Sequence, residues 1–214
     1  MISNELLKKK ILDEAIHGRL IENDLSLPPV DVEEIKEDIP FDIPSNWKWA
    51  ELQRICKLSN GEKITDINLP YLDVKYLRNR GDKTFKTNGV ILNCGDYIIL
   101  VDGENSGEVF TVPEKGIMGS TFKKLCLNEK VEEKYVMILL KYYQEILKNN
   151  KTGSAIPHLN KRIFSCLQVP IPPLEEQKKI VKKIEELFDL IDKKEKNDKE
   201  TEKIKTLLKE KILD

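Results

Sequence analysis

Histidine and cysteine are the side chains of this chain most able to catalyse a reaction or hold a metal, and both are sparse. His17 follows a predicted helix and is better placed to bond a helix-end carbonyl than to catalyse, and His158 has no evident nucleophile. The four cysteines are scattered without a C-x-x-C pair, which is typical of buried thiols rather than of a zinc site. The chain also lacks a nucleotide P-loop, a D/N-P-P-Y/F tetrapeptide and a nuclease-like P-D…E-x-K pattern. We therefore assign no catalytic residue, no metal ligand and no cofactor, and interpret the chain as a binding protein.

A first basic cluster lies between residues 75 and 88, where five Lys and Arg side chains accompany a single acid, Asp82. Tyr76 and Phe85 are interleaved with these cations. Lys and Arg suit DNA phosphates, and Arg, Asn, Gln and Lys suit base edges. The residues predicted to contact DNA here are Lys75, Arg78, Asn79, Arg80, Lys83, Lys86 and Asn88. The alternative is an ordinary solvated strand-and-turn surface.

A second basic cluster covers residues 151–162, which carry three fixed positive charges and no acid. Gly153 permits close approach of the backbone to a ligand. The predicted DNA contacts are Lys151, Thr152, Ser154, His158, Asn160, Lys161 and Arg162. The same segment could instead be structural and fix the loop before the last strand. Residues 102–107 and 120–124 are weaker candidates.

The net charge of −1 conceals an uneven distribution. Residues 1–44 hold 5 Lys and Arg against 11 Asp and Glu, residues 45–172 hold 19 against 14, and residues 173–214 hold 12 of each. Only the middle segment has the sign that a polyanion requires, and its excess is modest. No run of about 18 apolar residues and no signal-peptide pattern is present, so a cytoplasmic protein is expected.

The pattern of elements indicates an α+β fold. A short amphipathic helix over residues 4–17 is followed by an acidic, proline-containing connector. We expect strands at residues 97–101, 108–112, 122–127 and 167–169, a helix at 131–148 and a turn at 116–119, whereas 161–166 is ambiguous. The predicted organisation is an N-terminal helix (1–20), a connector (21–44), a globular domain (45–172) and a long helix (173–214).

Residues 174–213 follow one helical pattern, which would extend about 60 Å at 1.5 Å per residue. An apolar stripe of that length needs a partner helix. The residues predicted to make a dimer contact, on this helix and the N-terminal one, are Leu7, Ile11, Ile180, Ile184, Leu187, Ile191, Ile204 and Leu208. Residues 192–203 carry ten charges and no large apolar side chain. They fit either a solvated, salt-bridged stretch or a break in the helix.

The junction before this helix contains Pro170, Pro172 and Pro173. Because proline donates no backbone hydrogen bond, we expect the sheet to end here, and Pro173 suits the first turn of a helix. Glu175 and Glu176 fall in that turn, where the helix dipole favours carboxylates. The junction consists of a predicted strand, followed by P-x-P-P-L-E-E-Q and then by K-K-I-V-x-K-I. This order resembles the domain-to-helix junction of type I restriction-modification specificity subunits. Those are the DNA-reading subunits of a multisubunit methyltransferase and nuclease.

Residues 5–13 and 206–214 are identical at seven of nine positions. Chance similarity between two Lys/Leu-rich helices is one explanation, and the resemblance offers another. A full-length specificity subunit resembles two tandem units, each a target-recognition domain followed by a helix, and this chain has about half that length. The resemblance is strong over residues 153–191, fair over 6–20 and weak over 60–130.

The resemblance implies a half-length specificity subunit that recognises DNA through residues 45–172 and leaves catalysis to other chains. It implies a homodimer that reads a bipartite, palindromic site and recruits methyltransferase and restriction subunits. The partners expected are double-stranded DNA, a second copy and those subunits, with no membrane. The alternative is a coiled-coil scaffold whose α+β head binds a protein, which the near-neutral charge and the acidic N-terminal segment favour.

Overall fold

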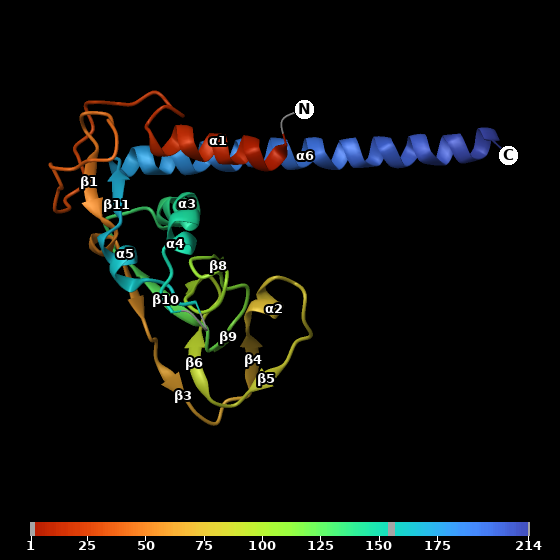
Figure 1. The fold of residues 1–214 in the computed structure, drawn as a ribbon, viewed down its shortest axis with the longest axis horizontal. Coiled ribbons are helices and arrows are strands. Elements are labelled where there is room, and N and C mark those ends of the chain that lie inside the picture. Colours follow the sequence, from red (N-terminus) through yellow and green to blue (C-terminus); the bar gives the residue numbers. More distant parts are fainter. Residues whose placement is uncertain (1–2, 154–156, 214) are drawn as a thin grey trace.

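The long helix α6 (Leu174–Leu213) runs along one side of an elongated molecule, and a strand-rich domain lies beside its N-terminal half (Figure 1). A computed structural model describes the backbone of residues 3–153 and 157–213 and the side chains of these ranges up to Thr201. Helix α1 (Asn4–Ile16) lies beside the first half of α6, and the second half of α6 extends beyond every other element (Figure 1).

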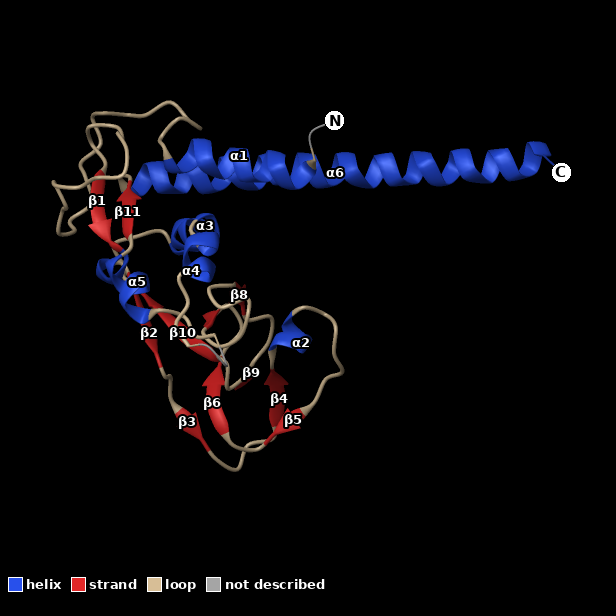
Figure 2. Ribbon diagram, in the orientation of Figure 1, coloured by secondary structure: helices blue, strands red, loops and turns tan. Residues whose placement is uncertain are grey.

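Three small sheets make up the domain (Figure 2). Their strands, in spatial order, are β1 (Lys48–Glu51) and β11 (Gln168–Ile171); β2 (Cys56–Ser59), β10 (Phe122–Leu127), β7 (Tyr97–Leu100) and β8 (Val109–Thr111); and β3 (Lys63–Ile64), β6 (Gly89–Leu92), β9 (Gly116–Met118), β4 (Leu69–Leu72) and β5 (Phe85–Lys86). All neighbouring strands are antiparallel except β4 and β9, which are parallel. The remaining elements are the 3-10 helix η1 (Leu52–Arg54) and the helices α2 (Val74–Leu77), α3 (Glu133–Tyr142), α4 (Gln144–Asn149) and α5 (Lys161–Cys166).

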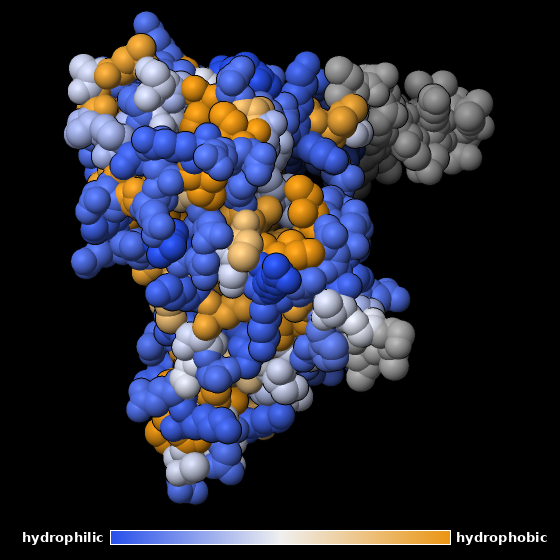
Figure 3. Space-filling view, turned by 60° about the vertical axis from the view of Figure 1, so that its left-hand side comes forward, coloured by the Kyte–Doolittle hydropathy of each residue, from blue (hydrophilic) through white to orange (hydrophobic). Residues whose placement is uncertain are grey.

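Two hydrophobic cores hold these elements together. The larger one joins α1, α3 and the first turns of α6 to the sheets, with Tyr135 and Phe164 among its largest side chains. The smaller one joins the four-stranded and the five-stranded sheet around Leu92 and Phe122, where Phe122 meets Phe110 edge to face. Hydrophilic residues cover most of the face seen in Figure 3, interrupted by smaller hydrophobic patches.

The structure confirms the α+β class and corrects three local expectations. Residues 116–118 form strand β9 rather than a turn, because Gly116 lets this strand approach β4 closely. The helix expected over 131–148 is two helices that meet at Tyr143. Residues 161–166, which the sequence left ambiguous, form helix α5.

The third correction concerns Pro170, which lies within β11 opposite Trp49 instead of ending the sheet. A two-stranded sheet has a free edge on each strand, so a proline whose nitrogen points outward costs no ladder bond. The Pro170 carbonyl accepts a hydrogen bond from the buried Tyr135 hydroxyl at 3.0 Å. The strand therefore continues to Ile171, and α6 starts at Leu174.

Two fully buried polar side chains fix the start of α6. The Glu176 carboxylate accepts hydrogen bonds from the Asp24 N–H at 2.7 Å and the Trp47 Nε1–H at 2.6 Å. Gln177 accepts from the Glu132 N–H and donates to the Pro172 carbonyl, both at 2.8 Å. The P-P-L-E-E-Q run thus ties the connector, the domain and α3 to one helical turn.

Helix α1 runs antiparallel to α6 and covers the face on which the dimer contact was predicted. Ile180, Ile184 and Ile191 are buried within one chain. Helix α1 of the same chain therefore already accompanies this part of α6, and the contact of these residues with a second copy stays a prediction. Of the other predicted residues, Leu7 is exposed, Ile11 and Leu187 are partly buried, and the side chains of Ile204 and Leu208 lie outside the described part.

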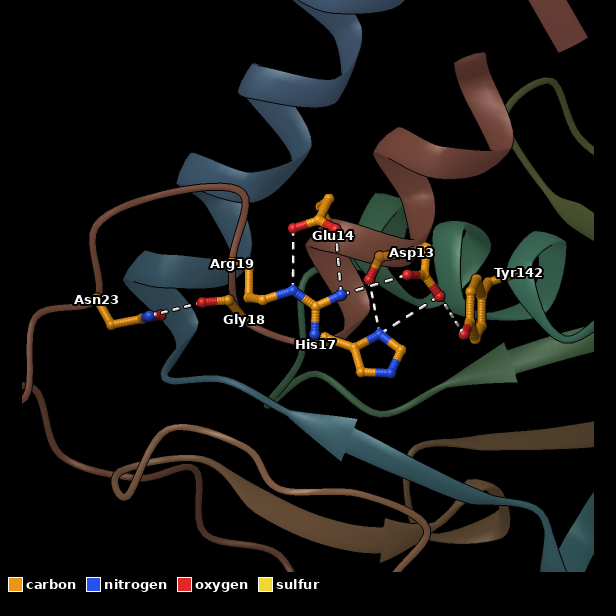
Figure 4. A network of polar contacts seen from close by, with 7 residues as sticks. All are labelled: Asp13, Glu14, His17, Gly18, Arg19, Asn23 and Tyr142. Atoms are coloured by element: carbon orange, nitrogen blue, oxygen red, sulfur yellow. Dashed lines mark hydrogen bonds and ion pairs between the residues drawn. The ribbon is translucent and has the colours of Figure 1, made fainter. Parts of the chain in front are cut away.

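A polar network holds the C-terminal end of α1 (Figure 4). The Tyr142 hydroxyl donates to Asp13 Oδ1 at 3.0 Å, and Arg19 donates to Glu14 at 2.9 Å and to Asp13 at 3.3 Å. Burial, and next the hydrogen bond to Asp13, raise the pKa of Tyr142 to about 12. The His17 ring bonds the Asp13 carbonyl at 2.8 Å, the helix-end role expected from the sequence.

Candidate nucleic-acid interface

The first basic cluster contains two cations that are already paired. Arg78 donates to Glu108, with Nε 3.3 Å from Oε1, and Lys83 Nζ lies 2.7 Å from Oε2 of Glu114. The hydrogen bonds to these carboxylates raise the pKa of both Arg78 and Lys83. Because acids of the same chain balance these charges, Arg78 and Lys83 are weaker candidates for phosphate contact than the sequence suggested.

Three other predicted residues of this cluster, Lys75, Asn79 and Arg80, are exposed around helix α2. Asn79 has a φ of 53°, so it forms the tight turn that ends α2. Within residues 3–153 and 157–201, Lys75 and Arg80 have no ion-pair partner.

Lys86 and Asn88 line an open hollow of about 570 Å³ in the five-stranded sheet. Its other lining residues are Asn60, Lys63, Tyr71, Gly89, Val90, Ile117, Met118, Gly119, Ser120, Phe122 and Lys123. The Lys86 ammonium lies 3.6 Å from the centre of the Tyr71 ring. As far as the described residues go, no carboxylate lines this hollow.

Tyr71 lines this hollow, and its hydroxyl is held by a neighbouring backbone group. The hydroxyl accepts a hydrogen bond from the Ser120 N–H at 3.3 Å. Burial acts to raise the pKa of Tyr71, but the hydrogen bonds to Ser120 and Lys86 outweigh it and leave the pKa below its ordinary value. Tyr71 therefore offers a flat ring and a polar tip, a combination that suits contact with bases.

The second basic cluster lines a second hollow, of about 560 Å³. His158 bonds Asp102 at 2.7 Å through Nδ1, and the backbones of Thr152 and His158 exchange two hydrogen bonds. Asn160 caps α5 by accepting from the Arg162 and Ile163 N–H groups. These contacts show that His158, Thr152 and Asn160 shape the loop, as the structural reading expects, and DNA contact by these residues stays a prediction.

The remaining cations of that segment differ in their surroundings. Lys161 and Arg162 are exposed on the first turn of α5 and line the second hollow. Lys151 donates to the Glu104 carbonyl at 2.8 Å and is partly buried. Ser154 lies outside the described residues.

Ser120 and Lys123 line both hollows, so the two hollows are neighbours on the domain surface, and together they are here called the basic groove. The cations that line it are Lys63, Lys86, Lys123, Lys161 and Arg162. Asp102, which is bonded to His158, is its one acid among the described residues. The groove brings together Lys86 and Asn88 from the first cluster with most of the second.

Three groove residues were missed in the sequence. Asn60 accepts a hydrogen bond from Lys123, and Lys63 and Tyr71 come from short strands on either side. The turn pair Asn60-Gly61 was a usable signal, since such pairs mark exposed turns. Lys63 and Tyr71 gave no such signal, because single residues on short strands form no recognisable sequence pattern with their neighbours.

The described residues contain no group of three or more His, Cys, Asp and Glu side chains that could hold a metal ion. Within the same residues, no helix has the length and apolar character needed to cross a membrane.

Comparison with known proteins places the chain in a family. The model of the type I restriction modification DNA specificity domain matches residues 44–203. The chain belongs to this family. The match runs from the end of the connector, through the whole strand-rich domain and its groove, into the charged centre of α6.

Several type I specificity subunits are similar to the chain. The MjaVIII subunit of Methanocaldococcus jannaschii is 35% identical over 170 residues, which cover 74% of this chain and 40% of that protein. The EcoAI subunit of Escherichia coli is 25% identical over 219 residues, covering 89% of this chain and 36% of that protein. The chain thus spans about two-fifths of the length of these relatives.

Solved structures share the fold. A chain from a study of the assembly and conformational transition of the type I R-M system aligns with a TM-score of 0.65 and 20% identity, covering 93% of this chain and 47% of that one. The HsdS subunit from Thermoanaerobacter tengcongensis aligns with a TM-score of 0.56 and 20% identity, covering 89% and 45%. Almost the whole of this chain therefore shares its fold with about half of each of these structures.

Proposed function

We propose that this chain is a non-catalytic, sequence-selective DNA-binding module of a type I restriction-modification enzyme. The observation that carries the proposal is the basic groove, which lies within the part of the chain that matches the specificity family. Its five cations come from four separate segments and line two neighbouring hollows. Such convergence is what phosphate contact requires.

The groove also holds groups with directional hydrogen bonds. Asn60, Asn88 and Tyr71 can read base edges or stack on bases, whereas the lysines fix the position of the duplex through phosphates. The Lys86–Tyr71 contact gives one lysine a fixed position in the free protein. We propose that Lys63, Lys86, Lys123, Lys161 and Arg162 are the main phosphate-contacting residues, and that Lys75 and Arg80 lie at the margin.

A single domain with a few phosphate contacts binds weakly and in a salt-sensitive way. Two domains on a rigid helical spacer raise the effective concentration at the second half-site when the geometry fits. We therefore propose that two copies pair through their long helices and read a two-part, palindromic site. Methyltransferase and restriction subunits would supply the chemistry, including extrusion of the target base from the duplex.

The test is selection from a random duplex library, followed by fluorescence anisotropy with the selected duplex at several salt concentrations. Lys86→Ala, Lys123→Ala and Arg162→Ala should each weaken binding and reduce the slope of log K against log salt by about 1. Lys83→Ala is the matched control, because Glu114 already pairs with Lys83, and its effect should be much smaller. Equal affinity for all duplexes in the library would refute sequence-selective recognition.

A further inference from the structure

His158 lies in the second hollow of the basic groove with one ring nitrogen already engaged. Its Nδ1 is 2.7 Å from Oδ1 of Asp102, and 51% of the His158 side chain is exposed. An ionised carboxylate only accepts hydrogen bonds, so Nδ1 carries the hydrogen of this contact. In a neutral ring, Nε2 is then left as a hydrogen-bond acceptor, and among the described residues it has no partner.

The backbone around this pair is fixed from two sides. The His158 N–H donates to the Thr152 carbonyl at 2.8 Å, and the Thr152 N–H donates to the His158 carbonyl at 2.9 Å. On the other side, the Leu159 N–H donates to the carbonyl of Val101, the residue before Asp102, at 2.8 Å. The ring and the carboxylate are thus held together before a ligand binds, and groups arranged in this way lose little conformational freedom on binding.

Other polar side chains of the groove have their oxygens engaged and are left to donate. Asn60 Oδ1 accepts a hydrogen bond from the Lys123 ammonium. Asn88 Oδ1 accepts from the Asp66 N–H at 3.2 Å. The side-chain amide hydrogens of both asparagines, like the hydroxyl hydrogen of Tyr71, remain for a ligand. Such donors suit phosphate oxygens and acceptor atoms of bases, so they do not select for a donor group on DNA.

We propose that Nε2 of His158 accepts a hydrogen bond from the exocyclic amino group of an adenine or a cytosine in the major groove. Phosphate and deoxyribose oxygens of a duplex only accept hydrogen bonds, so a neutral acceptor finds no partner among them. The donors that a duplex offers are N6 of adenine and N4 of cytosine in the major groove, and N2 of guanine in the minor groove. Only the major groove distinguishes all base pairs, so sequence-selective reading favours it. His158 is then a specificity-determining residue, and Asp102 is a positioning residue that acts through it.

The charges around His158 disfavour the rival contact, in which a protonated ring donates to a phosphate. The Asp102 carboxylate repels a phosphate at this point of the hollow. Lys123, Lys161 and Arg162 line the same hollow and offer phosphates permanently charged partners. The two contacts also differ in their response to salt, because only a phosphate contact releases counterions.

This inference rests on the proposed DNA recognition and names one base contact within it. The test repeats the random-library selection at pH 8, above the range in which histidine ordinarily titrates, with the wild-type chain and His158→Ala. The wild type should select adenine or cytosine at one position where His158→Ala selects no base. Binding of the selected duplex should be about 5- to 150-fold weaker for His158→Ala, with an unchanged slope of log K against log salt. Lys161→Ala is the matched comparison and should reduce that slope by about 1 while keeping the base preference.

Two further arms test the tautomer and the contact itself. In Asp102→Asn, the amide can accept from Nδ1–H or donate to Nδ1, so the ring is no longer confined to one tautomer. This variant should tolerate guanine or thymine at the same position and leave the rest of the motif unchanged. On the DNA side, purine in place of adenine, or 2-pyrimidinone in place of cytosine, removes the amino group. Either analogue should weaken the wild type about as much as His158→Ala does, and should have little further effect on that variant.

Several results would overturn the base contact while leaving DNA recognition in place. One is a selected motif in which no position responds to His158→Ala, and another is equal binding of the wild type to duplexes with and without the amino group. A smaller salt slope and an unchanged base preference in His158→Ala would assign the ring to a phosphate instead. An unchanged preference in Asp102→Asn would overturn the positioning role of Asp102. If the wild type selects no motif at all, the proposed function fails and this inference fails with it.

Discussion

Replacing Glu176 with Ala should destabilise the protein strongly. The carboxylate is fully buried and accepts from the Asp24 N–H and the Trp47 Nε1–H. The alanine variant leaves both donors without this acceptor in the protein interior, and each orphaned donor costs about 1–3 kcal/mol. The free energy of unfolding should therefore fall by about 2–6 kcal/mol. This is a large part of the total, because folded domains typically have an unfolding free energy of about 5–15 kcal/mol.

Urea unfolding followed by tryptophan fluorescence measures this loss, and Trp47 itself is a probe of the affected site. Glu176→Gln should cost less, because the amide keeps one acceptor oxygen. Glu175→Ala is the matched control: Glu175 is exposed and bonds only Lys178 among the described residues, so its effect should stay within about 0.5 kcal/mol. Equal stabilities for Glu176→Ala and Glu175→Ala would refute the argument that the buried acceptor anchors α6.

Two further predictions concern the domain itself. Burial, and next the neighbouring Cys126, raise the pKa of the Cys56 thiol to about 12. Above about pH 9 the unfolded chain loses this proton, whereas the folded chain keeps it. The free energy of unfolding should therefore fall by about 1.4 kcal/mol per pH unit up to pH 12. Cys56→Ala should flatten this fall in urea midpoints measured from pH 8 to 11, and an unchanged pH dependence would contradict the assignment. Gly116→Ala should lower the melting temperature, because a Cβ there would meet the Pro70 carbonyl oxygen at 2.6 Å, and overpacking of this kind costs about 1–3 kcal/mol; Gly95→Ala, with open space around its Cβ but a φ of +90°, separates crowding from backbone strain.

The sequence predicted elements whose signals are local. The proline junction and the 3.6-residue period of α6 are decided by backbone chemistry within a few residues, so the start of the helix was placed correctly at Leu174. Strand β9 was missed because its position depends on β4, which lies far away in the sequence and pairs with it in parallel. Pro170 was misplaced for a related reason: whether a proline interrupts a sheet depends on which edge its nitrogen faces.

The candidate site was less accessible to sequence reasoning than the fold. A run of cations such as residues 75–88 shows where charge is concentrated, but not which charges are already balanced. Glu108 and Glu114, which pair with Arg78 and Lys83, come from other segments of the domain. Conversely, Lys63 and Lys123 join Lys86 only because β3, β5 and β10 converge. Charge clustering is local, whereas charge exposure is set by tertiary structure.

The buried pair Glu176 and Gln177 links the fold of the domain to the direction of the long helix α6. Their partners, Asp24, Trp47 and Glu132, belong to the connector, the strand-rich domain and the start of α3. Three segments therefore converge on the first turn of α6, and the direction in which α6 leaves the domain is set by hydrogen bonds rather than by apolar packing alone. Apolar contacts tolerate small rotations, but buried hydrogen bonds are lost when donor and acceptor move apart. If two copies pair through α6, this turn fixes the orientation of each basic groove relative to the dimer axis, and hence the spacing of the half-sites that a dimer can reach.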